Sequence, residues 1–306
     1  MRIFYNLDDA QGKIKNAVVT VGSFDGVHAG HKAILKRLNQ IAAEQEGEST
    51  LITFNPHPRK VLYPHQTDLK LINSQEEKME LLSETGLQNL IVIPFTLEFS
   101  KTTSSAFVKN ILVDKLDCKV VVVGPNHHFG HNRQGDYSYL YKLGKELAFA
   151  VEEISILDVE NEIISSTKIR KALMEGNMQR ANAYLDNQYF IKSRLEPVSK
   201  TIDGKIWNFY AVTITETEKL LPPPGLYAAQ LRTKLFAQKG FVFIANNQPP
   251  CFEILLYCIE NQQFDSSGLV KILLHKRLET FTMSEATLIT SQQLNDAIET
   301  VNELLY

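Results

Sequence analysis

The chain has 306 residues, which is enough for two compact domains of ordinary size. Its 32 basic and 35 acidic residues give a formal charge of −3 at pH 7, and no block of one sign forms an electrostatic tail. This balance excludes nucleic acid and an anionic membrane as expected partners. The N-terminus reaches Asp8 without the apolar core of a signal peptide, and no later run approaches transmembrane length, so we expect a cytoplasmic protein. Cys118, Cys251 and Cys258 fit neither a disulfide framework nor a zinc site, and we interpret them as reduced core residues.

The first half of the chain alternates between predicted strands and helices. Four short apolar runs predict β-strands, at residues 17–21, 51–54, 90–94 and 119–123. They are rich in β-branched residues and apolar throughout, which is typical of strands buried on both faces of a parallel sheet. Helical periodicity separates them, at residues 34–42, 75–84 and 104–116. The pattern predicts an open α/β sheet, in which ligands bind where loops leave the carboxyl ends of the strands.

The pattern changes near Tyr189. Alternating segments and turn residues follow, at residues 207–214, 222–225, 226–231, 241–244 and 270–274. They predict a small β-barrel closed by a helix at residues 291–305. We therefore expect two domains, at residues 1–187 and 188–306.

A glycine-rich loop follows the first predicted strand and leads into a predicted helix. It reads Gly22-Ser23-Phe24-Asp25-Gly26-Val27-His28-Ala29-Gly30-His31. Glycines allow close backbone approach, and the N–H groups and positive dipole end of a helix attract phosphate. His28 and His31, three residues apart, share one face and can both donate to phosphate oxygens. One histidine alone would be interpreted as a cap or core residue, but the whole set predicts a phosphate site.

A second polar cluster follows a strand predicted near residues 152–157. It reads Ile164-Ser165-Ser166-Thr167-Lys168-Ile169-Arg170. An ordinary helix N-cap explains Ser165 or Ser166. It does not explain Arg170, a cation near the positive end of a helix, which is poorly placed for stability but well placed to reach a phosphate. Taken alone, the cluster is equally consistent with a plain cap and with a phosphate site.

Two further loops leave predicted strands. Residues 123–136 contain His127, His128 and His131, but without cysteine or helical spacing they do not predict a metal site, and histidines also hydrogen-bond and stack in nucleotide pockets. Residues 53–59 contain two prolines that stiffen the loop, and Phe54 could stack on a ring system or belong to the core.

In order and spacing, these four stretches resemble the prokaryotic bifunctional riboflavin kinase/FMN adenylyltransferase, also called FAD synthetase, a nucleotidyltransferase with an H-x-G-H motif. The likeness runs from about Ala17 to Tyr189 and includes residues 95–107 and the pattern of Gly176, Ala181 and Leu185. It implies a Rossmann-like nucleotidyltransferase domain with a parallel sheet, followed by a β-barrel domain of riboflavin-kinase type.

The resemblance also implies roles for individual residues. AMP would move from ATP to FMN, with Mg²⁺ carried by ATP oxygens and water rather than by a protein ligand. Three residues would be catalytic: His28, His31 and Arg170. The ATP-binding residues would be Gly22, Ser23, Phe24, Asp25, Gly30, Asn126, Ser166 and Thr167. The flavin side would be formed by Phe54, Pro56, His57 and Pro58. The chain departs from some relatives at Ile163, where they carry a basic residue, and at His127, where they carry an aromatic one.

The second half of the chain departs further. Family kinase domains carry a G-R-x-x-G-x-P-T-A-N signature, whose Pro-Thr-Ala-Asn element corresponds here to Tyr210-Ala211-Val212-Thr213. Ala211 has no hydroxyl to hold a metal, and bulky residues replace those that let the backbone approach a phosphate. Glu253 falls where the catalytic base is expected, although a salt-bridged strand residue would look the same. The sequence thus predicts a degenerate kinase site at Ala211, Thr213 and Glu253.

We expect an FAD synthetase whose riboflavin kinase activity is lost or nearly lost. Three alternatives stay open at this stage. One is a bifunctional enzyme that still accepts riboflavin at a rearranged kinase site. Another is a non-catalytic regulatory protein that binds flavin or nucleotide. The third is a nucleotidyltransferase for a different phosphate acceptor, because a fold alone does not fix the substrate.

Overall fold

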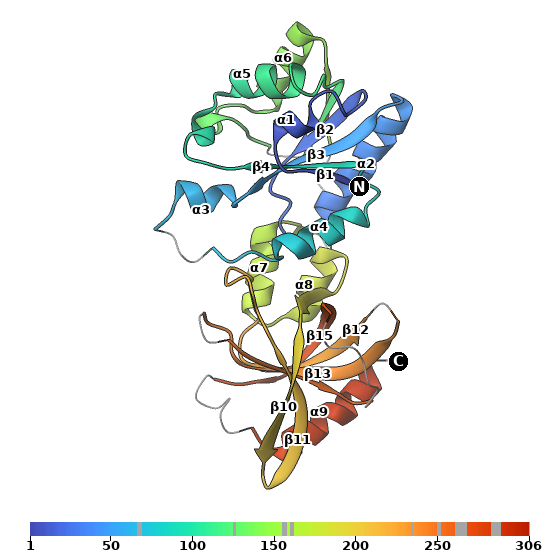
Figure 1. The fold of residues 1–306 in the computed structure, drawn as a ribbon, viewed down its shortest axis with the longest axis vertical. Coiled ribbons are helices and arrows are strands. Elements are labelled where there is room, and N and C mark those ends of the chain that lie inside the picture. The colour runs from blue at the N-terminus through green and yellow to red at the C-terminus, as the bar shows by residue number, and fades with distance from the viewer. Residues whose placement is uncertain are drawn as a thin grey trace. The chain divides into compact units, whose positions relative to one another are not determined.

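A computed structural model describes residues 1–65, 69–124, 127–154, 158–159, 162–233, 235–249, 252–260, 268–282 and 289–305. The chain forms two compact units (Figure 1). The α/β unit comprises Met1–Leu69 and Gln75–Ile164, and the barrel unit comprises Lys70–Ser74 and Ser165–Tyr306. The predicted fold class, a parallel α/β sheet followed by a small barrel, is confirmed.

The α/β unit is built on a six-stranded parallel sheet with strand order β1-β4-β3-β2-β5-β6. Its strands are β1 (Arg2–Phe4), β2 (Ala17–Val21), β3 (Glu48–Asn55), β4 (Asn89–Pro94), β5 (Val120–Val123) and β6 (Ala150–Glu153). Every residue of β2 and β5 is buried, as the continuous apolar runs predict. A separate two-stranded ribbon pairs β7 (Asp158–Val159) with β8 (Glu162–Ile163).

Helices cover both faces of this sheet. The helices of this unit are α1 (Leu7–Ala10), α2 (Ala29–Glu44), α3 (Pro58–Leu62), α4 (Gln75–Ser83), α5 (Ser104–Ala106), which continues as a π-helix (Phe107–Val113), and α6 (Tyr137–Leu147), with short 3₁₀ turns at Phe99–Lys101 and His131–Arg133. Val19 and Val21 of β2 share one core with the π-helix and α6. Leu35 and Leu38 of α2 are fully buried, and α2 packs on β2 and β3. Figure 1 shows α5 and α6 together on one side of the sheet.

The order of the strands fixes where a ligand can bind. The chain passes from β2 to β3 and β4 on one side, and then returns to place β5 on the other side of β2. The loop that leaves the carboxyl end of β2 therefore lies at the point where the strand order reverses, which is where open α/β sheets bind their ligands.

The barrel unit is a seven-stranded antiparallel sheet with strand order β10-β11-β14-β13-β12-β15-β9. Its strands are β9 (Tyr189–Ser193), β10 (Leu195–Ile202), β11 (Lys205–Val212), β12 (Gly225–Arg232), β13 (Ala237–Asn246), β14 (Glu253–Cys258) and β15 (Val270–Thr280). Trp207, Phe209 and Phe241 form its core with Leu294 and Val301 of α9 (Ser291–Leu304), the closing helix that the sequence predicts.

Two helices near the end of the first predicted domain belong to the barrel unit. They are α7 (Ser166–Met174) and α8 (Met178–Leu185), and they pack on each other. Among the described residues, no helix is long and apolar enough to cross a membrane. Cys118 and Cys258 are free thiols, and burial raises the pKa of each to about 12, whereas Cys251 lies outside the described residues.

Candidate functional site

The loop between β2 and α2 has an unusual backbone. Phe24, Gly26 and Val27 all have positive φ, at 48°, 91° and 40°. Glycine adopts this region freely, but for a β-branched residue such as Val27 it is strained and needs support from its surroundings. The support is visible, because Phe24 and Val27 are buried at 3% and 0% exposure and Gly22 N donates to Ile52 O at 3.0 Å. The loop is therefore held in one shape by the sheet beneath it.

This shape brings His28 and His31 into contact at the start of α2. His28 is the N-cap of the helix, and its Nδ1 accepts a hydrogen bond from His31 N at 3.4 Å. The two rings stack with centroids 3.7 Å apart, and Phe24 stacks on the other side of His31 at 4.4 Å. Because Nδ1 of His28 accepts, a neutral His28 carries its proton on Nε2 and can donate it to a ligand.

The surroundings of His31 shift its pKa. Burial, with further contributions from His28 and Lys78, holds the pKa of His31 well below its usual range. Its Nδ1 is shielded from solvent and has no hydrogen-bond partner among the described residues. A buried ring nitrogen without a hydrogen-bond partner is energetically costly.

Two residues that support the loop were not predicted from the sequence. Thr53 Oγ1 of β3 donates to Ser23 O at 3.3 Å, and Lys78 Nζ of α4 donates to the same oxygen at 3.5 Å. Lys78 is 8% exposed and lies on the same helix face as the buried Leu81 and Leu82. A lysine within an apolar helical stripe was the signal that could have identified it.

The loop after β3 adjoins the first loop, because β2 and β3 are parallel neighbours. The predicted flavin-side residues lie around this loop: Phe54 is near the end of β3, Pro56 and His57 are in the loop, and Pro58 begins α3. Phe54 packs against Phe95 and Phe99, with centroids 5.5 and 5.8 Å apart. His57 caps α3, its Nδ1 accepting from Arg59 N at 3.2 Å.

The loop after β5 contains the histidine cluster. His127 stacks on Phe129 with centroids 5.8 Å apart, and burial lowers the pKa of His127 to about 4. His131 Nδ1 lies 3.0 Å from Ser100 O. Within the described part of the chain, no three His, Cys, Asp or Glu side chains are grouped to hold a metal ion. Asn126, predicted to bind ATP, lies outside the described residues.

The second predicted phosphate motif belongs to the barrel unit, whereas His28 and His31 belong to the α/β unit. Ser165 is the N-cap of α7, with its Oγ accepting from Lys168 N at 3.4 Å, and Ser166 and Thr167 form the first turn. Arg170 is partly buried, and its Nε donates to Lys70 O at 2.9 Å.

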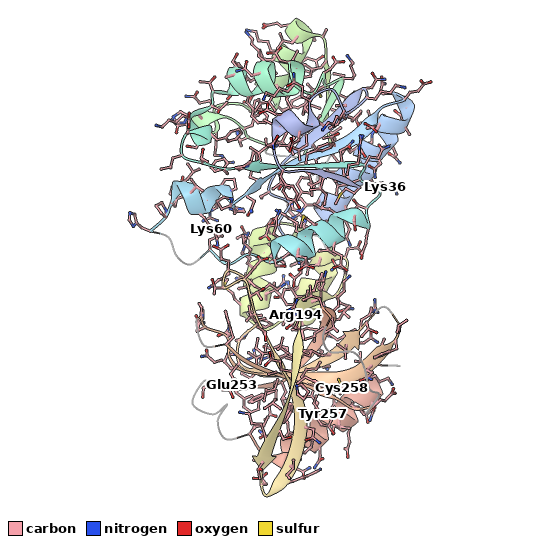
Figure 2. The ribbon with its side chains drawn as sticks, viewed as in Figure 1. Lys36, Lys60, Arg194, Glu253, Tyr257 and Cys258 are labelled. Carbon is pink, nitrogen blue, oxygen red and sulfur yellow. The ribbon has the colours of Figure 1, made fainter. Side chains whose placement is uncertain are left out.

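The predicted kinase remnant lies on the strands of the barrel. Ala211 pairs with Leu255 across β11 and β14, so a methyl group stands where the resemblance expects a hydroxyl. Thr213 follows β11 and is exposed. Glu253, labelled in Figure 2 at the start of β14, is half exposed and forms an ion pair with Lys200 at 3.4 Å.

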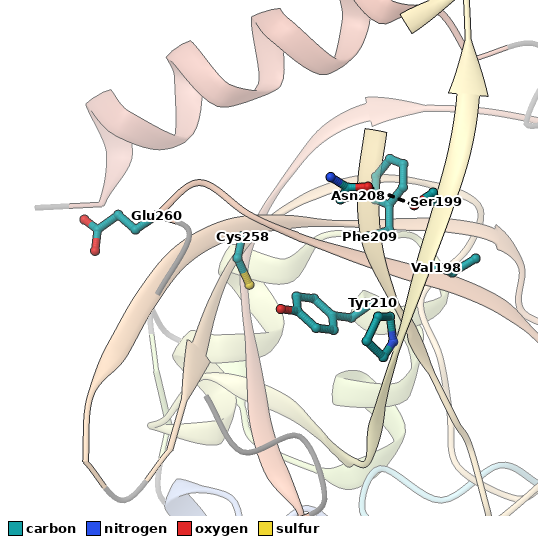
Figure 3. Close-up of a pocket in the computed structure, with 8 residues that line it drawn as sticks. Val198, Ser199, Asn208, Phe209, Tyr210, Cys258 and Glu260 are labelled. Atoms are coloured by element: carbon teal, nitrogen blue, oxygen red, sulfur yellow. Dashed lines mark hydrogen bonds between the residues drawn. The ribbon is translucent and has the colours of Figure 1, made fainter. Parts of the chain in front are cut away.

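The altered signature also lines a cavity of about 180 Å³, formed by Pro197, Val198, Ser199, Asn208, Phe209, Tyr210, Cys258 and Glu260. Figure 3 shows the Tyr210 hydroxyl directed toward the sulfur of Cys258. Burial, with Cys258 as a second cause, raises the pKa of Tyr210 above its usual range. Tyr210 and Cys258 are therefore neutral at physiological pH, and neither supplies a charge for phosphate chemistry.

Comparison with known proteins identifies the family of this chain. A family model for FAD synthetase matches residues 10–168. A bifunctional riboflavin kinase/FMN adenylyltransferase of Buchnera aphidicola subsp. Acyrthosiphon pisum is 30% identical over 232 residues, covering 76% of this chain and 73% of the relative. The protein of the same description from Listeria monocytogenes is 33% identical over 236 residues, with the same two shares.

A crystal structure described as that of a macrolide-efflux protein from Streptococcus pneumoniae matches 99% of this chain and 97% of its own, with a TM-score of 0.81. At 21% sequence identity this likeness concerns the fold alone. The family match over more than half of the chain, together with 30–33% identity to most of the length of two bifunctional enzymes, shows that the chain belongs to the FAD synthetase family.

Proposed function

We propose that this chain transfers the AMP of ATP to the phosphate of FMN, giving FAD and pyrophosphate, and that its barrel has lost riboflavin kinase activity. The observation that carries the first part is the stacked pair of His28 and His31 at the N-terminus of α2, directly after the strand where the sheet order reverses. Family membership supports the identity of the two substrates.

The proposed reaction is an in-line displacement. An oxygen of the FMN phosphate attacks the α-phosphorus, and the bond to the bridging oxygen of the β-phosphate breaks as pyrophosphate leaves with the electron pair. Negative charge grows on that leaving oxygen and its neighbours. The N–H groups at the start of α2 and the Nε2–H of His28 stabilise this charge, and removing one such donor typically costs about 10²–10³ in kcat.

Other residues bind and orient the substrates. Ser166, Thr167 and Arg170 are proposed to bind ATP phosphates. Gly22, Ser23, Phe24, Asp25, Gly30 and Asn126 are also proposed to bind ATP. Phe54, Pro56, His57 and Pro58 are proposed to form the flavin side, and the packing of Phe54 on Phe95 and Phe99 gives that side an aromatic surface. Mg²⁺ would enter with ATP and be held largely by ATP oxygens and water, as its coordination preferences favour.

The second part of the proposal rests on Ala211 and Tyr210. The methyl group of Ala211 cannot ligate a metal, and the Tyr210 ring occupies the position where the family signature has a proline. Glu253 forms an ion pair with Lys200 at 3.4 Å, as a salt-bridged strand residue would. The two relatives described above are bifunctional, so a working kinase is the alternative.

We place the adenylyltransferase domain at residues 1–187 and the kinase-like domain at residues 188–306. The family match extends to residue 168 and so includes Ser166 and Thr167. These residues fold within the barrel unit, so the proposed functional domain and the compact unit have different limits.

The proposal is tested by measuring FAD and pyrophosphate formed from FMN and MgATP, with riboflavin replacing FMN in a parallel assay. We expect FAD from FMN, no ADP with riboflavin, and a loss of about 10²–10³ in kcat for His28→Ala. Lys36→Ala, exposed on the same helix and labelled in Figure 2, is the matched control and should leave the rate unchanged. ADP formation with riboflavin would favour the bifunctional alternative, and absence of FAD would refute the transferase.

A further inference from the structure

A short segment of the chain is tied to the barrel unit although its sequence neighbours are not. Lys70–Ser74 lies in sequence between α3 and α4 of the α/β unit, yet it groups with the barrel unit. Leu71 N donates to Glu218 O at 2.8 Å, and Leu220 N donates to Leu71 O at 2.7 Å. Lys70 Nζ adds a hydrogen bond to Thr217 O at 2.9 Å. The segment is thus held against the connection between β11 and β12.

Lys219 fastens this segment from inside the barrel unit. Its side chain is 4% exposed, and Nζ donates to Ile72 O at 3.0 Å and to Phe190 O at 2.9 Å. Nζ also lies 4.3 Å from the centroid of the Tyr189 ring. A buried ammonium group is costly unless its donors are satisfied, and here two carbonyl oxygens and an aromatic face satisfy them. Lys219 therefore clamps Ile72 to the beginning of β9.

The clamped segment holds the side chain of Arg170. Lys70 O, two residues from Ile72, accepts a hydrogen bond from Arg170 Nε at 2.9 Å. This bond restricts the orientation of the guanidinium group. Because the guanidinium is planar and its donors form a rigid fork, its orientation decides whether it can bind phosphate oxygens in pairs.

We propose that Lys219 is a positioning residue for AMP transfer: it holds Lys70–Ser74 so that Lys70 O orients Arg170. The inference rests on the proposed function, in which Arg170 binds the ATP phosphates. It gives the barrel a part in AMP transfer that needs no kinase chemistry.

A double-mutant cycle tests the proposal. Lys219→Met should lower kcat/KM for ATP by about tenfold when Arg170 is present, because a misplaced contact group weakens transition-state binding. In an Arg170→Ala background the same change should cost less than about twofold, because the residue it positions is gone. Lys219→Arg should retain most of the activity. Equal losses in both backgrounds would show a merely structural role and overturn the proposal.

Two further variants serve as a control and as a second test of the proposal. Lys271→Met removes an ammonium group 4.9 Å from the centroid of Phe190, and it should leave kcat/KM unchanged. Lys70→Met removes only the exposed bond to Thr217, so it keeps the fold, and it should show a smaller loss that also vanishes with Arg170→Ala. If Lys219→Met does not fold, the double-mutant cycle of Lys70→Met with Arg170→Ala tests the proposal in its place.

An activity-independent measurement separates this inference from the proposed function. In protein labelled with ¹⁵N-arginine, the Nε–H signal of Arg170 is identified by its loss in Arg170→Ala. It should shift and exchange faster with water in Lys219→Met, or in Lys70→Met if Lys219→Met does not fold, but not in Lys271→Met. An unchanged signal would refute the clamp. If the wild-type protein makes no FAD but the Arg170 signal still shifts in the variant, the proposed function is refuted and the clamp is supported.

Discussion

The side chain of His31 is expected to take up a proton when ATP binds. In the free protein its pKa lies well below 6.5, so the ring is neutral at neutral pH. Phosphate oxygens beside the ring favour the charged form and raise its pKa in the complex. At a pH between the two pKa values the complex binds more protons than the free protein, so ATP affinity should rise as the pH falls through that window.

This proton uptake is measurable by titration calorimetry at pH 6.5 in buffers of different ionisation enthalpy. We predict a dependence on the buffer corresponding to a fraction of a proton up to about one, and its loss in His31→Asn, which keeps a hydrogen-bond donor but cannot be charged. An equal buffer dependence in the wild type and His31→Asn would contradict the prediction.

The sequence predicts some residues of the candidate site but not the contacts that hold them in place. His28 and His31 are close in sequence and start a helix, so their shared face follows from helix geometry alone. Lys78 is 47 residues from His31, and nothing local shows that its ammonium group reaches the carbonyl of Ser23. Likewise, the resemblance indicated Arg170, but not that a backbone oxygen 100 residues away fixes it.

The closing helix α9 should contribute strongly to the stability of the barrel unit. Its N-terminus carries a complete capping box between Thr290 and Gln293, and Leu294 is fully buried. Leu294→Ala should lower the free energy of unfolding by roughly 3 kcal/mol, because the truncation leaves a cavity in the barrel core. Glu299→Ala, exposed on the same helix, is the control and should change it by less than about 0.5 kcal/mol.

Trp207 provides the signal for that measurement. It is the single tryptophan of the chain, it is 2% exposed in the barrel core, and its Nε1 donates to Ser291 Oγ at 3.1 Å. Its fluorescence during denaturant unfolding therefore reports on α9 and the barrel. Similar midpoints for Leu294→Ala and the wild type would contradict the assigned role of the helix.

At the level of elements, apolar periodicity predicts where helices and strands occur, but it does not predict the type of helix or the shortest strand. Residues 104–116 predict a helix, and they form a short α-helix that continues as the π-helix Phe107–Val113. Phe107, Ile111 and Leu112 are buried in either geometry, so apolar spacing cannot distinguish the two hydrogen-bonding patterns. The edge strand β1 was missed because three residues are too few to show a period.

At the level of the whole molecule, the barrel unit is made of two separate stretches of the chain, Lys70–Ser74 and Ser165–Tyr306. Lys70–Ser74 joins the barrel through bonds such as that from Lys219 Nζ to Ile72 O, which spans 147 residues. Contacts of such long range leave no local pattern.

The most direct test of the account follows the transferred group itself. Protein supplied with FMN and ATP radioactive at the α-phosphate should produce radioactive FAD. Protein supplied with riboflavin and ATP radioactive at the γ-phosphate should leave the flavin unlabelled. Label from the γ-phosphate in FMN, or no label from the α-phosphate in FAD, would contradict the assignment of an adenylyltransferase that carries a silent kinase barrel.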